Sequence, residues 1–388
     1  AASVLKESGF DFTFFDFTFS NAAEDIIPVI DAEKPSLLVI YDDCFNYLSK
    51  MCLIHMREAT LRMITAGRSL GCRVIVCSSD ANDHYDIYLN HGADFIICGE
   101  GELTLVELVG KLLNSSENDF GDVKGIVWKT EGQIRVNRPR QIITDLDSLP
   151  FPLYDLADIE KYRNIWIRKN GIFTFNMVTT RGCPFQCIWC AKPVYGNNYH
   201  SRSAINVLRE IQEIRNKFHP DKIWFADDIF GLTPGWLEEF CRLALAMQIS
   251  IPYTIQSRVD LLTKESQVQQ LAKSGCTKIW LGVESGSQKI LDAMQKGITI
   301  EQIHNASALL RIYNIEQAFF LQLGFQGETR EDINSTIDLV TSLMPEDIGV
   351  SVTYPLPGTK LYNSVKEELQ IKANWTNSDE LTLMFVNN

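Results

Sequence analysis

The segment Thr179-Thr180-Arg181-Gly182-Cys183-Pro184-Phe185-Gln186-Cys187-Ile188-Trp189-Cys190 contains three cysteines within eight residues, in the spacing C-x3-C-x2-C. Because the chain has only ten cysteines in 388 residues, chance is a poor explanation for this grouping. Three neighbouring thiolates can surround one soft metal centre, and three local ligands leave one iron of a four-iron cluster open to an outside ligand. A structural zinc site with a distant fourth ligand and three unrelated thiols are the alternatives.

An alternation of strand and helix patterns surrounds this segment, from about residue 173 to residue 365. Between the strands lie helical patterns, such as the apolar positions Val207, Ile211 and Ile214. Six strand–helix units predict a (β/α)6 partial TIM barrel, in which chemistry gathers at the loops that follow the strands. The apolar runs typical of its strands begin near Phe175, Lys222, Pro252, Lys278, Glu316 and Asp347.

Residues 1–115 show a second alternation. Apolar runs without polar alternation, expected of parallel strands covered on both faces, occupy 12–17, 37–41, 73–77 and 95–98. We predict a Rossmann-like α/β domain that lacks its first strand, with its ligand at the carboxyl ends of the strands. A G-x-G-x-x-G fingerprint is absent from the sequence, which disfavours a dinucleotide.

Residues 116–172 differ from both of these regions. Residues 125–136 predict a β-hairpin around Glu131-Gly132, and Leu149-Pro150-Phe151-Pro152 interrupts regular structure. We interpret 116–172 as a linker that packs between the domains, and 366–388 as the start of a C-terminal extension.

The composition is that of an ordinary globular protein, with 45% hydrophobic and 22% charged residues. The net charge of −13 argues against general attraction to nucleic acid. The ten cysteines are too sparse for a disulfide scaffold, and no apolar run approaches the roughly 18 residues of a membrane span. These features predict a cytoplasmic protein without a membrane span or a nucleic-acid partner.

The cysteine segment, placed after the first barrel strand, resembles the radical S-adenosylmethionine (radical SAM) superfamily. The resemblance implies that Cys183, Cys187 and Cys190 bind a 4Fe-4S cluster and that S-adenosylmethionine chelates its fourth iron. Reductive cleavage would then release a 5′-deoxyadenosyl radical that abstracts hydrogen from the substrate. The electron would come from a donor such as flavodoxin or ferredoxin.

The later strand ends also resemble this superfamily, although Gln326 stands where a proline is usual. A carboxylate after the second strand suits the ammonium group of S-adenosylmethionine, and an arginine after the third suits its carboxylate. The same residue types also serve as helix caps, surface ion pairs or structural carboxylates. The resemblance assigns the S-adenosylmethionine contacts to Trp189, Asp227, Asp228, Ser257, Arg258, Glu284 and Gln322.

The order of the parts resembles the cobalamin-binding branch of the superfamily, which includes radical methylases and the anaerobic magnesium-protoporphyrin monomethyl ester cyclase. The D-x-H-x-x-G motif of other corrinoid proteins is absent from the sequence, so a bound cobalamin would have no histidine on cobalt. The residues expected to surround the corrinoid are Tyr41, Asp42, Asp43, Cys44, Ser78, Ser79, Gly99, Glu100 and Gly101.

We therefore expect a cobalamin-dependent radical SAM enzyme that methylates an unactivated carbon of a small, apolar substrate. Oxidative cyclisation or hydroxylation is the alternative within this branch. A methylthiotransferase or a non-catalytic corrinoid or redox sensor would also be compatible with the cysteine motif. Cys72 and Cys77 are expected to be buried apolar residues and not ligands of a second cluster. The catalytic residues are not assigned, and candidate substrate contacts in the barrel are Trp280, Phe319, Gln322 and Tyr354.

Overall fold

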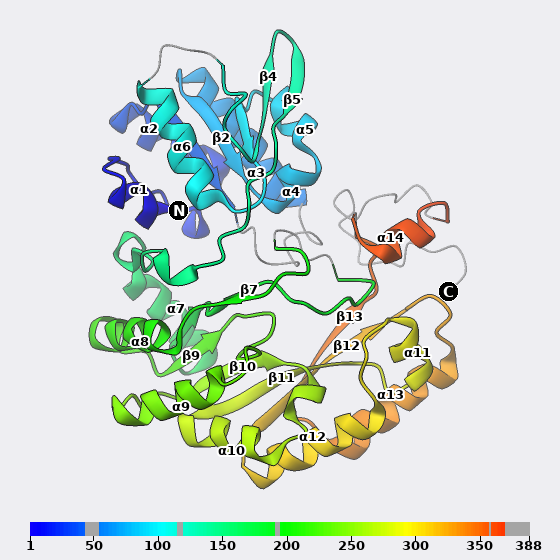
Figure 1. Ribbon diagram of the computed structural model, residues 1–388. Helices are drawn as coiled ribbons and strands as arrows, with labels where there is room; N and C mark the ends of the chain where they lie inside the picture. The colour runs from blue at the N-terminus through cyan, green and yellow to red at the C-terminus, as the bar shows by residue number, and fades with distance from the viewer. Residues whose placement is uncertain (43–53, 115–118, 191–194, 357, 369–388) are drawn as a thin grey trace.

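The computed structural model describes residues 1–42, 54–114, 119–190, 195–356 and 358–368, which form two α/β units (Figure 1). The N-terminal unit is built on a five-stranded sheet, and the second unit on a six-stranded parallel sheet. No helix in these ranges is long and apolar enough to cross a membrane.

The N-terminal sheet has the order β1-β2-β3-β4-β5, and its first three strands are parallel. Along β2, Val74 and Val76 pack into one buried core, whereas Ile75 and Cys77 pack into another on the opposite face. Helices cover both faces, which explains the apolar runs of the sequence. The strands are β1 (Leu37–Tyr41), β2 (Arg73–Cys77), β3 (Phe95–Ile97), β4 (Ile126–Thr130) and β5 (Gln133–Val136); the helices are α1 (Ala2–Glu7), α2 (Ile27–Glu33), α3 (Ile54–Ser69), α4 (Ser79–Asp83), α5 (Tyr85–Asn90) and α6 (Gly101–Asn114).

One prediction for this half of the chain is wrong and another is confirmed. Residues 12–17 lie in the described part of the chain but form no strand; Asp16 instead accepts a hydrogen bond from the Thr18 amide and caps a 3-10 turn at Phe17–Phe19. The predicted hairpin around Glu131-Gly132 is present as β4–β5. It pairs antiparallel with β3 and thereby extends the N-terminal sheet, because the apolar side chains of β4 complete the core beside Phe95.

All six predicted barrel strands are present. Their order, β13-β12-β11-β10-β9-β6, forms an open, curved parallel sheet, which confirms the partial barrel. The strands are β6 (Thr174–Met177), β9 (Lys222–Phe225), β10 (Tyr253–Ser257), β11 (Cys276–Glu284), β12 (Glu316–Leu323) and β13 (Asp347–Val352).

The helices of this unit cover the outer face of the curved sheet in Figure 1, except for α14, which lies above it. In α8, Ser203 caps the first turn, and Val207, Ile211 and Ile214 face the core as predicted. The helices are α7 (Ile159–Asn170), α8 (Ala204–Phe218), α9 (Trp236–Ala246), α10 (Glu265–Ser274), α11 (Gln288–Ala293), α12 (Ile300–Ile312), α13 (Arg330–Leu343) and α14 (Lys360–Val365).

Candidate functional site

The three cysteines lie in the loop between two very short strands, β7 (Thr180–Arg181) and β8 (His200–Ser201), which pair as a hairpin directly after β6. Cys183, Cys187 and Cys190 are half-buried, and no disulfide involves them in the described structure. We call residues 182–190 the cysteine loop.

Backbone contacts fix the end of the cysteine loop against the barrel. The Ile188 amide donates a hydrogen bond to the Met294 carbonyl (3.1 Å), and the Ile188 carbonyl accepts one from Leu361 (3.0 Å). Ile188 and Trp189 also pack on a small apolar core shared by α11 and α14. The loop is therefore held between the end of α11 and α14.

A glycine is required at the start of the cysteine loop. Gly182 has a φ of +83°, and a Cβ there would lie 2.1 Å from the carbonyl oxygen of Asn198. Any side chain would push apart the two sides of the β7–β8 hairpin. Gly182 therefore sets the backbone path that leads into Cys183.

Three half-buried thiols in one loop are the donor set that an iron–sulfur cluster uses. Among the described residues, no three His, Cys, Asp or Glu side chains are close enough to hold a single metal ion. A four-iron cluster differs from that arrangement, because each thiolate binds its own iron. The residues present thus fit a cluster by their chemistry and their position at the carboxyl end of the barrel.

Asp227, at the carboxyl end of β9, supports the backbone that precedes the cysteine loop. It is 1% exposed, and its carboxylate accepts hydrogen bonds from the Thr179 amide (2.7 Å), the Thr179 hydroxyl (2.5 Å) and the Thr180 amide (2.8 Å). Burial raises its pKa to about 6, although these hydrogen bonds act in the other direction. Asp228 is exposed beside it.

Arg258, after β10, contacts the cysteine loop directly. Its guanidinium lies 3.7 Å from the ring centroid of Phe185, at cation–π distance, and the side chain is 5% exposed. It donates hydrogen bonds to Asp260 (2.9 and 3.2 Å) and to the Lys296 carbonyl (2.7 Å). The hydroxyl of Ser257, also buried, donates to the Arg258 carbonyl (3.3 Å).

Glu284, at the end of β11, forms a buried ion pair with Lys296 at 2.7 Å. Glu284 has a φ of +64°, an uncommon conformation for a residue with a side chain. The Lys296 ammonium also lies 6.0 Å from the centre of the ring of Trp189, the residue that precedes Cys190 in the sequence. A Cβ on Gly282 would lie 2.6 Å from Lys296 Nζ, so this glycine makes room for the ion pair.

Several buried polar atoms at this end of the barrel have no hydrogen-bond partner in the described structure. They include Trp189 Nε1, Gln322 Oε1 at the end of β12 and Thr353 Oγ1 just after β13. Because an unsatisfied buried polar atom is costly, these atoms fit a site that receives a polar ligand. S-adenosylmethionine, with amino, carboxylate, hydroxyl and adenine groups, is such a ligand.

Among the substrate candidates on the strands, Phe319 does not face the inside of the barrel, whereas the next residue, Phe320, does. Phe319 is fully buried in the outer core with Leu281 and Leu321, whereas its neighbour Phe320 stacks on Trp280 at 4.7 Å. Successive side chains of a strand point to opposite faces, so a shift of one residue exchanges core and cavity. Trp280 and Phe320 therefore share the face opposite to that core.

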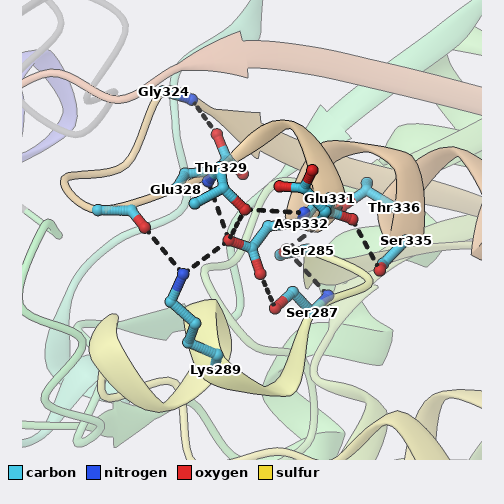
Figure 2. A network of polar contacts seen from close by, with 11 residues as sticks. Ser285, Ser287, Lys289, Gly324, Glu328, Thr329, Glu331, Asp332, Ser335 and Thr336 are labelled. Atoms are coloured by element: carbon cyan, nitrogen blue, oxygen red, sulfur yellow. Dashed lines mark hydrogen bonds and ion pairs between the residues drawn. The ribbon is translucent and has the colours of Figure 1, made fainter.

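A polar network joins the loop after β11 to the start of α13 (Figure 2). Asp332 accepts hydrogen bonds from Ser287 (2.7 Å), Lys289 (2.8 Å) and the Thr329 amide (2.9 Å). These contacts lower the pKa of Asp332, the ammonium of Lys289 contributing most. The network braces the loop that follows Glu284.

The N-terminal candidates gather at the carboxyl ends of β1, β2 and β3. Ser78 caps α4, and its neighbour Ser79 is buried. A Cβ on Gly101 would lie 2.8 Å from Tyr41, so Tyr41 packs on the first turn of α6. The Asp42 amide donates to the Cys77 carbonyl (2.9 Å), Gly99 has open space beside its Cα, and Asp43 and Cys44 lie outside the described residues.

Glu100 contacts the second unit at Arg181, directly before the cysteine loop. Its Oε1 accepts a hydrogen bond from Arg181 Nη1 (2.6 Å), and its Oε2 accepts one from the Ile143 amide (2.5 Å). Glu102 Oε1 accepts from Arg181 Nη2 (2.5 Å). Burial acts to lower the pKa of Arg181, but Glu102 and Glu100 outweigh it, so the pKa rises and the guanidinium stays charged.

Sequence reasoning missed Arg181, Lys296 and Phe320. Arg181 stands inside the quoted motif, but its partners lie 79 and 81 residues away in the chain. Lys296 follows α11 and carries no motif of its own. Phe320 lies in an unbroken apolar run of β12, so no local pattern distinguishes it from Phe319.

Residues 177–340 match the radical SAM superfamily. The chain is 29% identical to an uncharacterised methyltransferase of Pyrococcus horikoshii, over 73% of this chain and 60% of that protein. It is 24% identical to the anaerobic magnesium-protoporphyrin IX monomethyl ester cyclase of Synechocystis sp., over 97% of this chain and 73% of that protein. The chain thus spans less than two thirds of the length of the first of these relatives.

Among solved structures, the chain is similar to TsrM from Kitasatospora setae, a radical S-adenosylmethionine methyltransferase determined with cobalamin and a [4Fe-4S] cluster bound. The TM-score is 0.80 at 18% identity, over 94% of this chain and 73% of that chain. The similarity covers both α/β units and establishes that they share the fold of that protein.

Proposed function

We propose that this chain, in which residues 177–340 match the radical SAM superfamily, is an enzyme that methylates a carbon atom of a small, apolar molecule with the help of cobalamin. The fold likeness to TsrM, which was determined with cobalamin bound, supports the corrinoid because it includes the N-terminal unit. The methyltransferase relative supports the reaction type. A donor such as flavodoxin or ferredoxin would supply the electron.

The observation that supports the cluster and S-adenosylmethionine most strongly is the contact of two cationic side chains with the cysteine loop. Arg258, after β10, lies on Phe185, and Lys296, after α11, lies near Trp189, so the two side chains meet the loop on both sides of Cys187. Neither contact is needed for three thiols of a structural zinc site. Both are expected where an anionic cofactor group has to be held beside a cluster.

When bound, the cluster supplies the electron for reductive cleavage of S-adenosylmethionine, and cobalamin serves as methyl carrier. Cys183, Cys187 and Cys190 would bind the cluster. Arg258 would hold the carboxylate of S-adenosylmethionine, and Glu284, oriented by Lys296, its ribose hydroxyls. Further contacts would come from Trp189, Asp228, Ser257 and Gln322, whereas Asp227 would position Thr179 and Thr180.

The corrinoid would lie at the carboxyl ends of the N-terminal strands. We propose contacts from Tyr41, Asp42, Ser78, Ser79, Gly99 and Gly101, and assign Glu100 to Arg181. We also propose that the N-terminal unit includes the hairpin, because β5 pairs with β4 and β4 pairs with β3 of that sheet.

Oxidative cyclisation is the second candidate, because the cyclase relative covers 97% of this chain. The two reactions differ in their products: methylation adds a methyl group to the substrate, whereas cyclisation forms a new ring bond without it. Mass spectrometry of products formed from methyl-labelled S-adenosylmethionine distinguishes them.

The first test is the visible spectrum of protein reconstituted anaerobically with iron, sulfide and hydroxocobalamin and then desalted. We expect the broad absorbance of an iron–sulfur cluster together with a corrinoid band at one equivalent per chain. Cluster absorbance without retained corrinoid would contradict the cobalamin proposal but not the radical chemistry.

The matched variants are Cys187→Ala and Cys241→Ala. Cys187→Ala should lose the cluster and all cleavage of S-adenosylmethionine but keep its far-UV circular dichroism. Cys241 lies on α9, where it is buried in the apolar core of the barrel and does not belong to the cysteine loop. Cys241→Ala should therefore retain the cluster. Cleavage that survives in Cys187→Ala would contradict the cluster assignment.

A further inference from the structure

The β7–β8 hairpin lies between the two units and has one face toward each. Thr180 pairs with Ser201, and Arg181 pairs with His200. The Ser201 hydroxyl is 2.9 Å from that of Thr233, which belongs to the barrel. Arg181 instead reaches Glu100 and Glu102 of the N-terminal unit.

The charged side chains of Arg181, Glu100 and Glu102 are buried together. The exposed fractions are 14% for Arg181, 4% for Glu100 and 7% for Glu102. Arg181 precedes the first cysteine of the loop by two residues, so the ion pairs lie at the base of the cysteine loop. Water screens buried charges weakly, so they act over a longer distance than surface charges.

We propose that Glu100, Glu102 and Arg181 form a charge cluster by which the N-terminal unit sets the reduction potential of the iron–sulfur cluster. This inference rests on the cluster assignment of the proposed function but not on cobalamin. Arg181 is a positioning residue in this arrangement: it joins the carboxylates of one unit to the metal-binding loop of the other.

The sign of the effect follows from Coulomb's law. Reduction adds one electron to the cluster, and a nearby carboxylate opposes that added negative charge, whereas a guanidinium favours it. A unit charge about 10 Å from a redox centre, at an effective dielectric constant of about 20, changes the reduction equilibrium by roughly tenfold. Removing Glu102 and removing Arg181 should therefore shift the potential in opposite directions.

Glu102 offers the cleaner substitution of the two carboxylates. Its Oε1 bonds to Arg181, but its Oε2 is buried without a partner. In Glu102→Gln, the amide oxygen can keep the hydrogen bond to Arg181. The amide nitrogen replaces Oε2, so its introduction breaks no hydrogen bond. Charge changes while the hydrogen bond remains.

Glu107 provides the matched control. It lies on the same helix, α6, but its side chain is 43% exposed and pairs with Arg140. Glu107→Gln removes the same charge from the same element, away from Arg181. The potential of this variant should equal that of the wild type.

The experiment is a redox titration of the reconstituted cluster followed by electron paramagnetic resonance, without substrate or corrinoid, at mildly alkaline pH. Glu102→Gln should raise the equilibrium constant for reduction of the cluster by a factor of roughly ten. Arg181→Gln should lower this constant, and Arg181→Lys should restore the wild-type value. A merely structural role would not give opposite signs. Should Arg181→Gln fail to hold a cluster, Glu102→Gln against Glu107→Gln decides.

Equal potentials in wild type, Glu102→Gln and Glu107→Gln would overturn the inference and leave the proposed function intact. Shifts of the same sign in Glu102→Gln and Arg181→Gln would also overturn it. A wild-type protein that binds no cluster would instead contradict the proposed function on which the inference rests.

Discussion

At the scale of single residues, the site is held together by side chains that orient other side chains. Glu284 occupies a left-handed backbone conformation that costs free energy and persists only where its surroundings fix it. Lys296 supplies part of that fixation through a 2.7 Å ion pair. The same lysine presents its carbonyl to Arg258, so it links two of the expected cofactor contacts.

We expect Lys296→Met to weaken S-adenosylmethionine binding by roughly tenfold or more, because it leaves the buried carboxylate of Glu284 without its cation. Lys296→Arg should retain most of the affinity. The measurement is the dissociation constant of S-adenosylmethionine for the reconstituted protein.

Lys217→Met is the control for Lys296→Met, because Lys217 is an exposed lysine that pairs with Asp155. Equal affinities in Lys296→Met and Lys217→Met would show that Lys296 does not position the ligand.

Asp227 predicts a pH dependence of stability. Burial raises its native pKa from 3.8 to about 6, so the native state binds this proton more tightly than the unfolded chain does. Its contribution is therefore complete below the unfolded pKa and is lost as pH rises through about 6. Between about pH 4 and about pH 6, the apoprotein should lose roughly 2 kcal/mol relative to Asp227→Asn. Urea unfolding at several pH values checks this, and parallel curves for the two proteins would contradict it.

At the scale of elements, the cysteine loop depends on the close approach of two chain segments. The Asn198 carbonyl occupies the space where a side chain at Gly182 would stand. Gly196 also has a positive φ, +60°, but nothing lies within 4 Å of the position that its Cβ would take. Substitutions at these two glycines therefore distinguish the effect of backbone strain, which both would have, from that of steric overlap, which only Gly182 would have.

Gly182→Ala should lose most of its bound iron after reconstitution, because the hairpin must open to admit the methyl group. Gly196→Ala meets only the strain of a left-handed residue, about 1 to 2 kcal/mol, and should keep its iron. Iron and sulfide analysis of both variants tests this. The steric argument fails if the two variants bind equal amounts of iron.

Elements were easier to predict from the sequence than contacts were. The six barrel strands carry apolar runs that burial requires, so the sequence indicates each of them. The run at 12–17 misled because aromatic residues also pack from irregular backbone, as Phe15 and Phe17 do. The S-adenosylmethionine and corrinoid contacts stay predictions, and the pairs Arg181–Glu102 and Lys296–Glu284 depend on tertiary structure that no local pattern encodes.

At the scale of the whole molecule, the two units have separate cores. Ile75 lies in a core of the N-terminal sheet, and Leu281 lies in the core of the barrel. Polar contacts join the units, including the Tyr162 hydroxyl with Asp16 (2.8 Å) and Arg181 with Glu100. An interface of this kind couples two units without merging their cores.

We therefore expect Ile75→Ala and Leu281→Ala to act on different units. Each should destabilise its own unit by about 2 to 5 kcal/mol, as large-to-small core substitutions do. Hydrogen exchange followed by mass spectrometry should show faster exchange confined to the unit that carries the substitution. Faster exchange in both units with either variant would mean that the molecule unfolds as one cooperative body.

The hydrogen bonds of Arg181 to Glu100 and Glu102 also constrain how such a protein can diverge. Arg181 must remain compatible with Glu100 and Glu102, from which it is separated by 81 and 79 positions in the sequence. A buried arginine without its carboxylates is costly, and so are buried carboxylates without their arginine. Chimeras that exchange the N-terminal unit between relatives should therefore tolerate the exchange only when both sides of this junction are transferred together. Recombination within the chain meets the same restriction, whatever substrate each descendant acquires.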